Sequence, residues 1–358
     1  MGFFGIGGFF GGLFGGFGTF FPLLTGRRNA PEGEVGVFSE DEPYEIGFAE
    51  HYDTNLRPRI EEFEKTRIAA IKRARSRLLM MLPVLAAGLL FSAYVLILSD
   101  WQEDARDLSF WGVLVAFVGI FWWFNQPLKQ YQASIKSDIF PQIVSFLGEY
   151  RYTADIPDRI EQYGDFGIVP SYDDEYSEDQ IIGAYKGVEI DLFETRLEET
   201  RGSGKNRGTV TVFEGIVISL SLHKTFEGKT IVKKDRGRLV NWVKDKFSSL
   251  EAVRLEDPRF EKEFEVYSTD QVEARYLLTT SFMDRLVDLR EVFGGEGIQC
   301  SFYQNQLLMM IPIQRNMFEP GSVFEVEDFI DDAKSLLKEM DIIHQIIDTL
   351  KLDLDIGL

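Results

Sequence analysis

The chain has 358 residues with 58 acidic and 38 basic side chains, so its formal net charge is −20 at pH 7. So acidic a protein repels nucleic acid as a whole, and we predict no nucleic-acid partner. Cys300 is the only cysteine, which excludes an internal disulfide and a thiolate metal cluster.

The chain opens with an arm rich in glycine and phenylalanine and free of charge, residues 1–26. One interpretation is a membrane-dipping helix, because Gly8, Gly12 and Gly16 recur at four-residue spacing. We favour a disordered arm whose Phe side chains partition into the membrane interface, since each glycine costs a helix about 1 kcal/mol relative to alanine. Residues 27–50 are acidic and turn-rich and are typical of a linker. We therefore expect residues 1–50 to be mostly disordered.

Residues 51–77 are predicted to form a helix that leads into a membrane. Pro58 suits its first turn, and its acidic residues precede its basic ones, which matches the helix dipole. We expect its juxtamembrane basic residues to contact lipid phosphate, above all Lys72, Arg73, Arg75 and Arg77.

Two charge-free apolar runs follow, at residues 78–99 and 108–124. The first would cross roughly 30 Å of hydrocarbon, whereas the second is near the lower limit of about 17 residues for a span. We interpret residues 78–126 as a two-helix transmembrane hairpin. The alternatives are a buried helical hairpin of a soluble protein and a re-entrant second segment.

The charges around the two runs predict an orientation. Basic residues precede the first run, Lys129 and Lys136 follow the second, and the loop between the runs is mainly acidic. Because positive flanks stay on the cytoplasmic side, we predict a multi-pass protein of a bacterial inner membrane with cytoplasmic N- and C-termini.

Residues 129–358 are predicted to form a cytoplasmic α+β domain, an antiparallel sheet packed by helices. Alternation of apolar and polar residues predicts a meander with strands at 188–192, 210–222 and 230–233. Residues 298–313 are predicted to form a strand pair or one long strand. Helices are expected at about 130–149 with a break at Pro141, and at 239–250, 258–264, 268–293 and 327–352.

The last of these helices carries a heptad seam: Phe329, Ala333, Leu336, Met340, Ile343, Ile347 and Leu350. The seam either packs on the protein's own sheet or joins two copies of the chain, so an oligomer through residues 329–350 is one alternative.

A basic edge is expected at one end of the meander, formed by two connections that return to the same side. Its members are Arg201, Lys205, Arg207, Lys233, Lys234, Arg236 and Arg238. We hypothesise that this edge faces anionic lipid or an acidic partner, and the alternative is a pair of solvated hairpin ends.

Residues suited to catalysis or metal binding are sparse. His51, His223 and His344 have no metal-ligand spacing, and the GSGK sequence at 202–205 lacks the residues of a phosphate-binding loop. The acidic stretch 173–179 lacks the pattern of an EF-hand, and we interpret it as a solvated turn. We therefore predict no catalytic residue, cofactor or metal.

Two stretches, TVFEGIVISLSLHKTFEGKTIV at 211–232 and RLEDPRFEKEFEVYSTDQVEARYLLTTSFMDRL at 254–286, resemble the bacterial membrane family called domain of unknown function 3137. The resemblance covers roughly residues 55–352 and implies two N-terminal spans and a cytoplasmic domain without an assigned activity. It also implies a partner, a small helical membrane protein of the LemA type. The signature positions are Phe213, Gly215, Asp257, Phe260, Phe264, Asp270, Glu273, Ala274, Arg275 and Tyr276, which we interpret as fold-defining.

Two functions follow as hypotheses. The first is a membrane-tethered interaction or scaffold protein that binds another membrane protein or anionic lipid. The alternative is an enzyme that acts on a lipid or envelope precursor, with a site near Asp270, Glu273 and Arg275.

Overall fold

The computed structural model describes residues 23–24, 35–98, 103–202, 207–222, 226–234, 250–255, 257–292, 297–313, 324 and 328–355. Within α4, the side chains of residues 103–110, 113, 114 and 117 are also left undescribed. The Gly/Phe-rich arm, apart from Leu23 and Leu24, therefore lies outside the described residues, as do residues 239–249 of the helix predicted at 239–250. The chain divides into two units, one built mainly from residues 50–139 and one from residues 38–49, 140–319 and 329–358.

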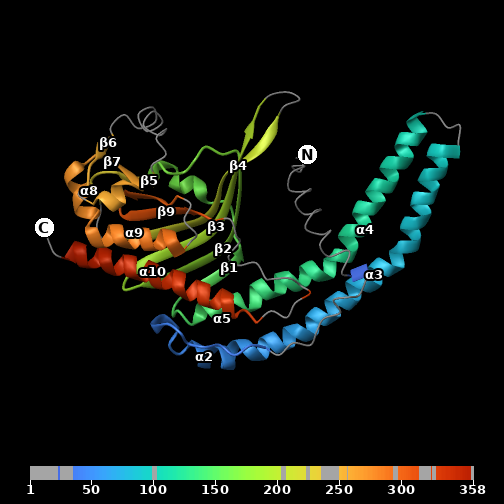
Figure 1. Ribbon diagram of the computed structural model, residues 1–358, viewed down its shortest axis with the longest axis horizontal. Helices are drawn as coiled ribbons and strands as arrows, with labels where there is room; N and C mark the ends of the chain where they lie inside the picture. Colours follow the sequence, from blue (N-terminus) through green and yellow to red (C-terminus); the bar gives the residue numbers. More distant parts are fainter. Residues whose placement is uncertain are drawn as a thin grey trace. The chain divides into compact units, whose positions relative to one another are not determined.

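The first unit is a pair of long helices that lie side by side (Figure 1). A short helix α2 (Phe48–His51) and a π-helical turn η2 (Tyr52–Leu56) lead into α3 (Arg57–Leu98), and α4 spans Glu103–Asp138. The start of the pair is fastened by two hydrogen bonds. The Tyr52 hydroxyl donates to the carbonyl oxygen of Asp328 at 2.8 Å, and the Arg57 guanidinium donates to that of Gly36 at 2.9 Å.

The second unit contains a nine-stranded sheet in which every described pairing is antiparallel, so the α+β prediction is confirmed. The strand order is β1-β2-β3-β4-β9-β8-β5-β7-β6. The strands are β1 (Arg151–Asp155), β2 (Asp174–Tyr185), β3 (Val188–Arg201), β4 (Gly208–Ser221), β5 (Thr230–Lys234), β6 (Glu251–Val253), β7 (Phe264–Ser268), β8 (Gln299–Tyr303) and β9 (Gln306–Pro312).

Helical segments cover both faces of this sheet. They are η1 (Pro43–Glu45), α5 (Phe140–Ser145), η3 (Ile160–Phe166), α7 (Pro258–Glu261), α8 (Gln271–Leu277), α9 (Thr280–Val292) and α10 (Ile330–Asp355). The Phe282 ring of α9 lies 5.4 Å from the Phe302 ring of β8. The next residue back, Ser301, donates to the carbonyl oxygen of Phe166 in η3 at 2.8 Å. Since neighbouring residues of a strand point to opposite faces, α9 and η3 cover opposite faces of the sheet.

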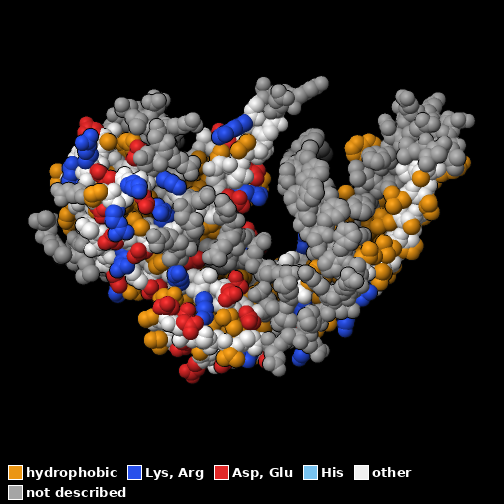
Figure 2. Space-filling model, in the orientation of Figure 1, with side chains coloured by type: hydrophobic (Ala, Val, Ile, Leu, Met, Phe, Trp, Pro, Cys, Tyr) orange, Lys and Arg blue, Asp and Glu red, His pale blue; other side chains and the backbone are white. Residues whose placement is uncertain are grey.

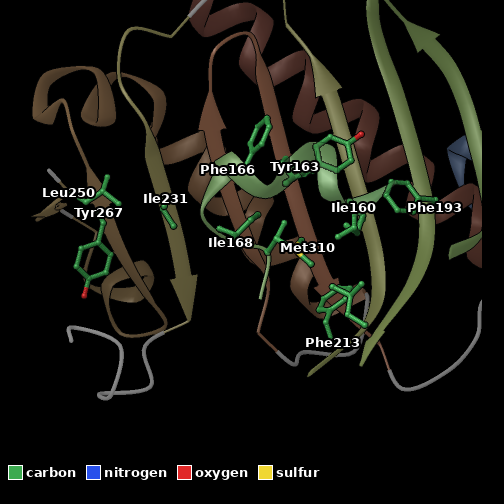
Figure 3. Packing of buried hydrophobic residues seen from close by; sticks show 14 residues of the cluster. Ile160, Tyr163, Phe166, Ile168, Phe193, Phe213, Ile231, Leu250, Tyr267 and Met310 are labelled. Atoms are coloured by element: carbon green, nitrogen blue, oxygen red, sulfur yellow. The ribbon is translucent and has the colours of Figure 1, made fainter. Parts of the chain in front are cut away.

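The face under η3 holds a cluster of buried apolar side chains (Figure 3). Tyr163 and Phe166 of η3 meet edge to face, and Tyr163 stacks on Phe193 of β3 at 6.3 Å. The cluster continues across the sheet to Ile231 and Tyr267. Because β4 is covered on both sides, its residues 216–220 are buried in succession rather than alternately.

The predicted meander is correct for its first pair and wrong for its third strand. β3 pairs with β4 along their whole length, but β4 then pairs with β9, and β5 pairs with β7 and β8. The β8–β9 hairpin, the strand pair expected at 298–313, is inserted between β4 and β5. The sequence pattern did not predict this strand order, because the paired strands lie far apart in the sequence.

Three other predictions need correction. The acidic stretch 173–179 is not a solvated turn, because residues 174–179 belong to β2 and pair with β3. The helix predicted at 258–264 ends at Glu261, and Phe264 opens β7. The helix predicted at 268–293 is two helices, since Leu278 leaves the helical conformation and the Thr279 hydroxyl accepts from the Phe282 N–H at 3.2 Å, which caps α9.

The linker prediction is wrong for residues 38–49, which pack within the second unit. Phe48 is fully buried, with its ring 4.7 Å from that of Phe38 and 4.9 Å from that of Phe146. Lys334 of α10 pairs with Asp41 at 2.5 Å. This contact lowers the pKa of the Asp41 carboxyl, chiefly through the hydrogen bond from Lys334. The ring contacts of Phe38, Phe48 and Phe146 therefore stabilise a packed conformation of this acidic, turn-rich segment.

The heptad seam of α10 is buried within the chain. Phe329, Ala333, Leu336, Met340, Ile343 and Ile347 are all buried, and α10 lies beside α9 (Figure 1). Packing within the protein therefore accounts for these six seam residues without a second copy of the chain.

Candidate functional site

The apolar half of α3 is exposed along most of its length. The helical stretch Pro43–Val95 is long and apolar enough to cross a membrane, and only 17% of its apolar window is buried. The core helix of a soluble protein that meets the same length and composition criteria is usually mostly buried. Figure 2 shows hydrophobic side chains along this part of α3. The exposed large side chains are Leu79, Met80, Val84, Leu89, Leu90, Phe91 and Tyr94.

The second predicted span, residues 108–124, lies within α4, where Trp111, Val115 and Trp122 are exposed. Several α4 side chains in this region are outside the described set, and the structure shows one candidate span among the described residues. The two-span hairpin and its orientation therefore stay predictions.

The juxtamembrane basic residues form a collar directly before the apolar window of α3. Lys72 and Arg73 are exposed, whereas Arg75 and Arg77 are half-buried. Lys129, on the neighbouring helix α4, is also exposed. We use the name basic collar for Lys72, Arg73, Arg75, Arg77 and Lys129. Its position next to an apolar surface is the pattern expected where a helix leaves a bilayer.

The basic edge predicted on the sheet is not a single surface among the described residues. Arg201 and Arg207 are exposed on β3 and beside β4, and Arg201 pairs with Glu199 at 2.7 Å. Lys233 is only 4% exposed, and β5 is separated from β4 by β8 and β9. Lys205, Arg236 and Arg238 lie outside the described residues. The strand order that sequence could not predict is the reason for the difference.

The first group of signature residues stabilises a local turn. The Asp257 carboxylate accepts from the N–H groups of Arg259 and Phe260 at 2.8 and 3.2 Å, which caps α7. The rings of Phe260 and Phe264 stack at 4.7 Å and are both buried. These contacts agree with a fold-defining role.

A second group of signature residues, which includes Asp270 and Glu273, forms hydrogen bonds that stabilise the loop before β5 at residues 226–229. Asp270 caps α8 by accepting from the N–H groups of Val272 and Glu273 at 2.8 and 2.9 Å. The Glu273 carboxylate in turn accepts from the N–H groups of Glu227 and Gly228 at 3.0 and 2.7 Å. Both carboxylates are thus committed to backbone donors.

The remaining signature residues also contact their surroundings structurally. The Arg275 guanidinium donates to the carbonyl oxygen of Gln271 at 2.9 Å, within its own helix. Ala274 is buried and Tyr276 is half-buried. Phe213 and Gly215 lie on β4, where Phe213 joins the core under η3. Asp270, Glu273 and Arg275 thus each make a hydrogen bond to a backbone atom.

Replacing Glu273 by alanine is expected to destabilise the sheet domain by about 2 kcal/mol, because two backbone N–H groups lose their charged acceptor. Thermal unfolding of the full chain in detergent would measure the loss. Glu227→Gln is the matched control, since it removes one negative charge from the same loop but leaves both N–H groups bonded. Equal stability of Glu273→Ala and Glu227→Gln would contradict the assigned role.

Two residues of the acidic stretch 173–179 come together at a bulge in β2 with a third, Glu194, that the sequence did not single out. Ligand atoms of Glu178, Asp179 and Glu194 lie within 4.8 Å of one another, as for a cation site. Asp179 has φ +54° at the register shift after Glu178, and the Tyr152 hydroxyl donates to its carboxylate. Asp179 and Glu194 are buried and Glu178 is exposed. Three acidic side chains alone do not establish a metal site, and we assign none here.

A polar network on the η3 face joins three side chains of separate elements. Arg159 pairs with Asp191 at 2.5 Å, and Gln180 donates to the same carboxylate at 2.7 Å. Burial raises the pKa of the Asp191 carboxyl, and the Arg159 charge partly offsets that effect. The Arg159 guanidinium also lies 5.0 Å from the Phe193 ring centre. The network ties the start of η3 to β3.

His344 of α10 is held between two tyrosines. Its ring stacks on Tyr185 at 3.9 Å, and its Nε2 atom lies 2.7 Å from the Tyr150 hydroxyl. Burial lowers the pKa of the imidazole, which favours the neutral ring. Gly183 leaves room for Tyr150, since a Cβ there would lie 2.2 Å from the tyrosine ring. The contact is a docking point between α10 and the β2–β3 hairpin.

Two surface cavities of the second unit are open and do not include Asp270 or Glu273. One, of about 530 Å³, is lined by charged and hydroxyl side chains of α7, α9 and α10, among them Arg259, Asp284 and Arg285. The other, of about 330 Å³, lies along β6 and β7.

Comparisons with known proteins place one part of the chain. Residues 211–352 match the family model described as Protein of unknown function (DUF3137). No curated protein matches the chain. Among solved structures, the chain is similar to one described as "crystal structure of the mycobacterial trehalose monomycolate transport factor A, TtfA".

That similarity has a TM-score of 0.32 at 13% identity and covers 57% of this chain and 91% of the other. The family match does not extend to the helix pair, but it confirms the domain that the sequence motifs indicated. Residues 211–352 of this chain therefore match the DUF3137 family model, whose members have no assigned function.

Proposed function

We propose that this chain is a membrane-tethered interaction protein. In this proposal α3 and α4 cross a bacterial inner membrane as a hairpin and keep the sheet domain at the cytoplasmic surface. There the domain binds another membrane protein or anionic lipid. The observation that carries the proposal is the exposed apolar surface of α3, which ends at the basic collar.

The physical argument for the bilayer rests on the extent of that surface. Soluble monomers rarely expose large contiguous apolar patches, because water penalises them. From Leu78 to Leu98 an α-helix rises about 30 Å, the thickness of a hydrocarbon core. Lipid would cover the side chains that the protein leaves exposed.

The basic collar supports the proposed orientation. Its residues precede the apolar window on α3 and lie on the matching end of α4, so both ends of the hairpin carry positive charge on one side. Positive residues near a span stay in the cytoplasm, and each contributes about 1 kcal/mol near an anionic surface.

Cysteine labelling in spheroplasts would test this topology. The native chain has a single cysteine, Cys300, which is expected to give little background labelling. The Cys300 side chain is fully buried, and burial raises the pKa of its thiol, so the unmodified chain serves as the background. We expect a membrane-impermeant maleimide to label Gln102→Cys in intact spheroplasts. Ser76→Cys and Lys186→Cys should react only after permeabilisation.

Two outcomes would overturn the topology. Labelling of Ser76→Cys in intact spheroplasts would reverse the orientation. Protection of Gln102→Cys until permeabilisation would show that the loop between the helices does not reach the far side.

The binding role needs a separate measurement. The family resemblance points to a small helical membrane protein of the LemA type as partner. Co-purification of the tagged full chain with that protein from detergent-solubilised membranes, followed by reconstitution of the purified pair, would support the role. Failure of the purified proteins to associate in nanodiscs, with no binding to anionic lipid either, would contradict it. The enzyme alternative gains no observation, because Asp270 and Glu273 accept backbone hydrogen bonds.

A further inference from the structure

A proline inside α4 leaves one backbone acceptor of that helix without its usual donor. Pro127 lies within the continuous helix Glu103–Asp138. Because proline has no N–H, the carbonyl oxygen of Trp123, four residues earlier, loses its partner from the next turn. A buried carbonyl without a donor is costly, above all where water is excluded.

The missing donor is replaced by a side chain of the neighbouring helix. The Nη1 atom of Arg77 in α3 donates to the Trp123 carbonyl oxygen at 2.9 Å. The same guanidinium lies 4.9 Å from the centre of the Trp123 ring. A planar guanidinium suits both contacts at once, since it can stack on an aromatic face while an N–H donates to an oxygen.

The position of Arg77 in the sequence makes this contact effective. Arg77 is the last basic residue before the apolar window, and the next residue, Leu78, is fully buried. Lys72 and Arg73 of the basic collar are exposed, so they remain accessible to lipid phosphate. The Arg77 guanidinium instead contacts the carbonyl oxygen and the ring of Trp123 within the helix pair.

We propose that Arg77 is a positioning residue that latches α3 to α4 at the carbonyl freed by Pro127. The latch fixes the register of the two helices and the course of α4 beyond the proline. The latch deepens the proposed anchor and rests on it only for the statement that this end of the pair meets the membrane surface.

A double-mutant cycle on the purified full chain in nanodiscs would test the latch. Arg77→Ala is expected to raise hydrogen exchange of the α4 amides around Trp123 about tenfold, because the freed carbonyl destabilises this turn. In the Pro127→Ala background the helix supplies its own donor, and Arg77→Ala should then change exchange less than about twofold. Arg73→Ala removes the same charge one turn away and should have no effect in either background.

Two results would overturn the latch. One is an equal effect of Arg77→Ala in both backgrounds, which would mean that charge or packing alone matters. The other is no effect in the unmodified background. If Arg77→Ala alone does not fold, recovery of folded protein by Pro127→Ala supports the latch, and no recovery contradicts it.

The conservative variant adds a second readout. Arg77→Lys keeps the charge but loses the planar group, so we expect intermediate exchange. The cycle tests the latch independently of the proposed membrane anchor, because Arg77 and Pro127 both lie in the first unit. Repeated in detergent, it reports on the latch even if the labelling experiment finds no hairpin across the membrane.

Discussion

Replacing both Leu89 and Leu90 by arginine is expected to remove the chain from the carbonate-resistant membrane fraction. The two side chains are 61% and 72% exposed near the middle of the apolar half of α3. Each arginine at the centre of a span costs about 3 kcal/mol for insertion, so the pair should prevent the first span from entering the bilayer. The second run alone is near the lower length limit for a span.

Leu89→Ala with Leu90→Ala is the matched control, because it shortens the same two side chains without adding charge and should stay in the membrane pellet. Carbonate extraction followed by immunoblotting gives the readout. Retention of the double arginine variant in the pellet would contradict the proposed anchor.

Gly215→Ala is expected to destabilise the sheet domain by about 3 kcal/mol, because β9 approaches β4 too closely for a side chain. A Cβ at this position would lie 2.1 Å from the carbonyl oxygen of Ile311 and 2.8 Å from the Cα of Pro312. Both neighbours are backbone atoms of a paired strand, so they cannot move aside without loss of the β4–β9 pairing. The change should lower the melting temperature by about 10 °C.

Gly208→Ala in the same strand is the control, since a Cβ there meets no atom within 4 Å. Circular dichroism of both variants in detergent compares them directly. A Gly215→Ala protein that melts with the Gly208→Ala protein would show that this signature glycine is not required by the close approach of β9.

Several elements were predictable because their signals are local. The charge-free run of α3, the hairpin of β3 and β4 and the periodic seam of α10 each repeat one pattern over many residues. The motif around Asp257 and Asp270 also indicated its domain, and both residues prove to be helix caps. A cap depends only on the next three residues, which is why sequence suffices to find it.

Other features depend on contacts between distant residues. The insertion of β8 and β9 beside β4 separates the basic residues that the predicted meander had brought to one edge. The buried Phe48 ring packs against Phe146, whose ring lies 4.9 Å away and which follows almost a hundred residues later. The acidic residues of β2 take part in a strand because β3 pairs with them. Local composition favoured a turn and a linker at these places, and tertiary packing overrode it.

By itself, the sequence determined that the chain carries an apolar, charge-free helix with a basic flank and that a region resembling DUF3137 follows it. These properties depend on composition and short-range order. Only the tertiary structure decided which strands are neighbours, that Glu273 holds the loop at residues 226–229 and that Arg77 reaches the carbonyl beside Pro127. Such pairings join residues tens of positions apart, and no local pattern specifies them, because the partners meet only when the elements pack.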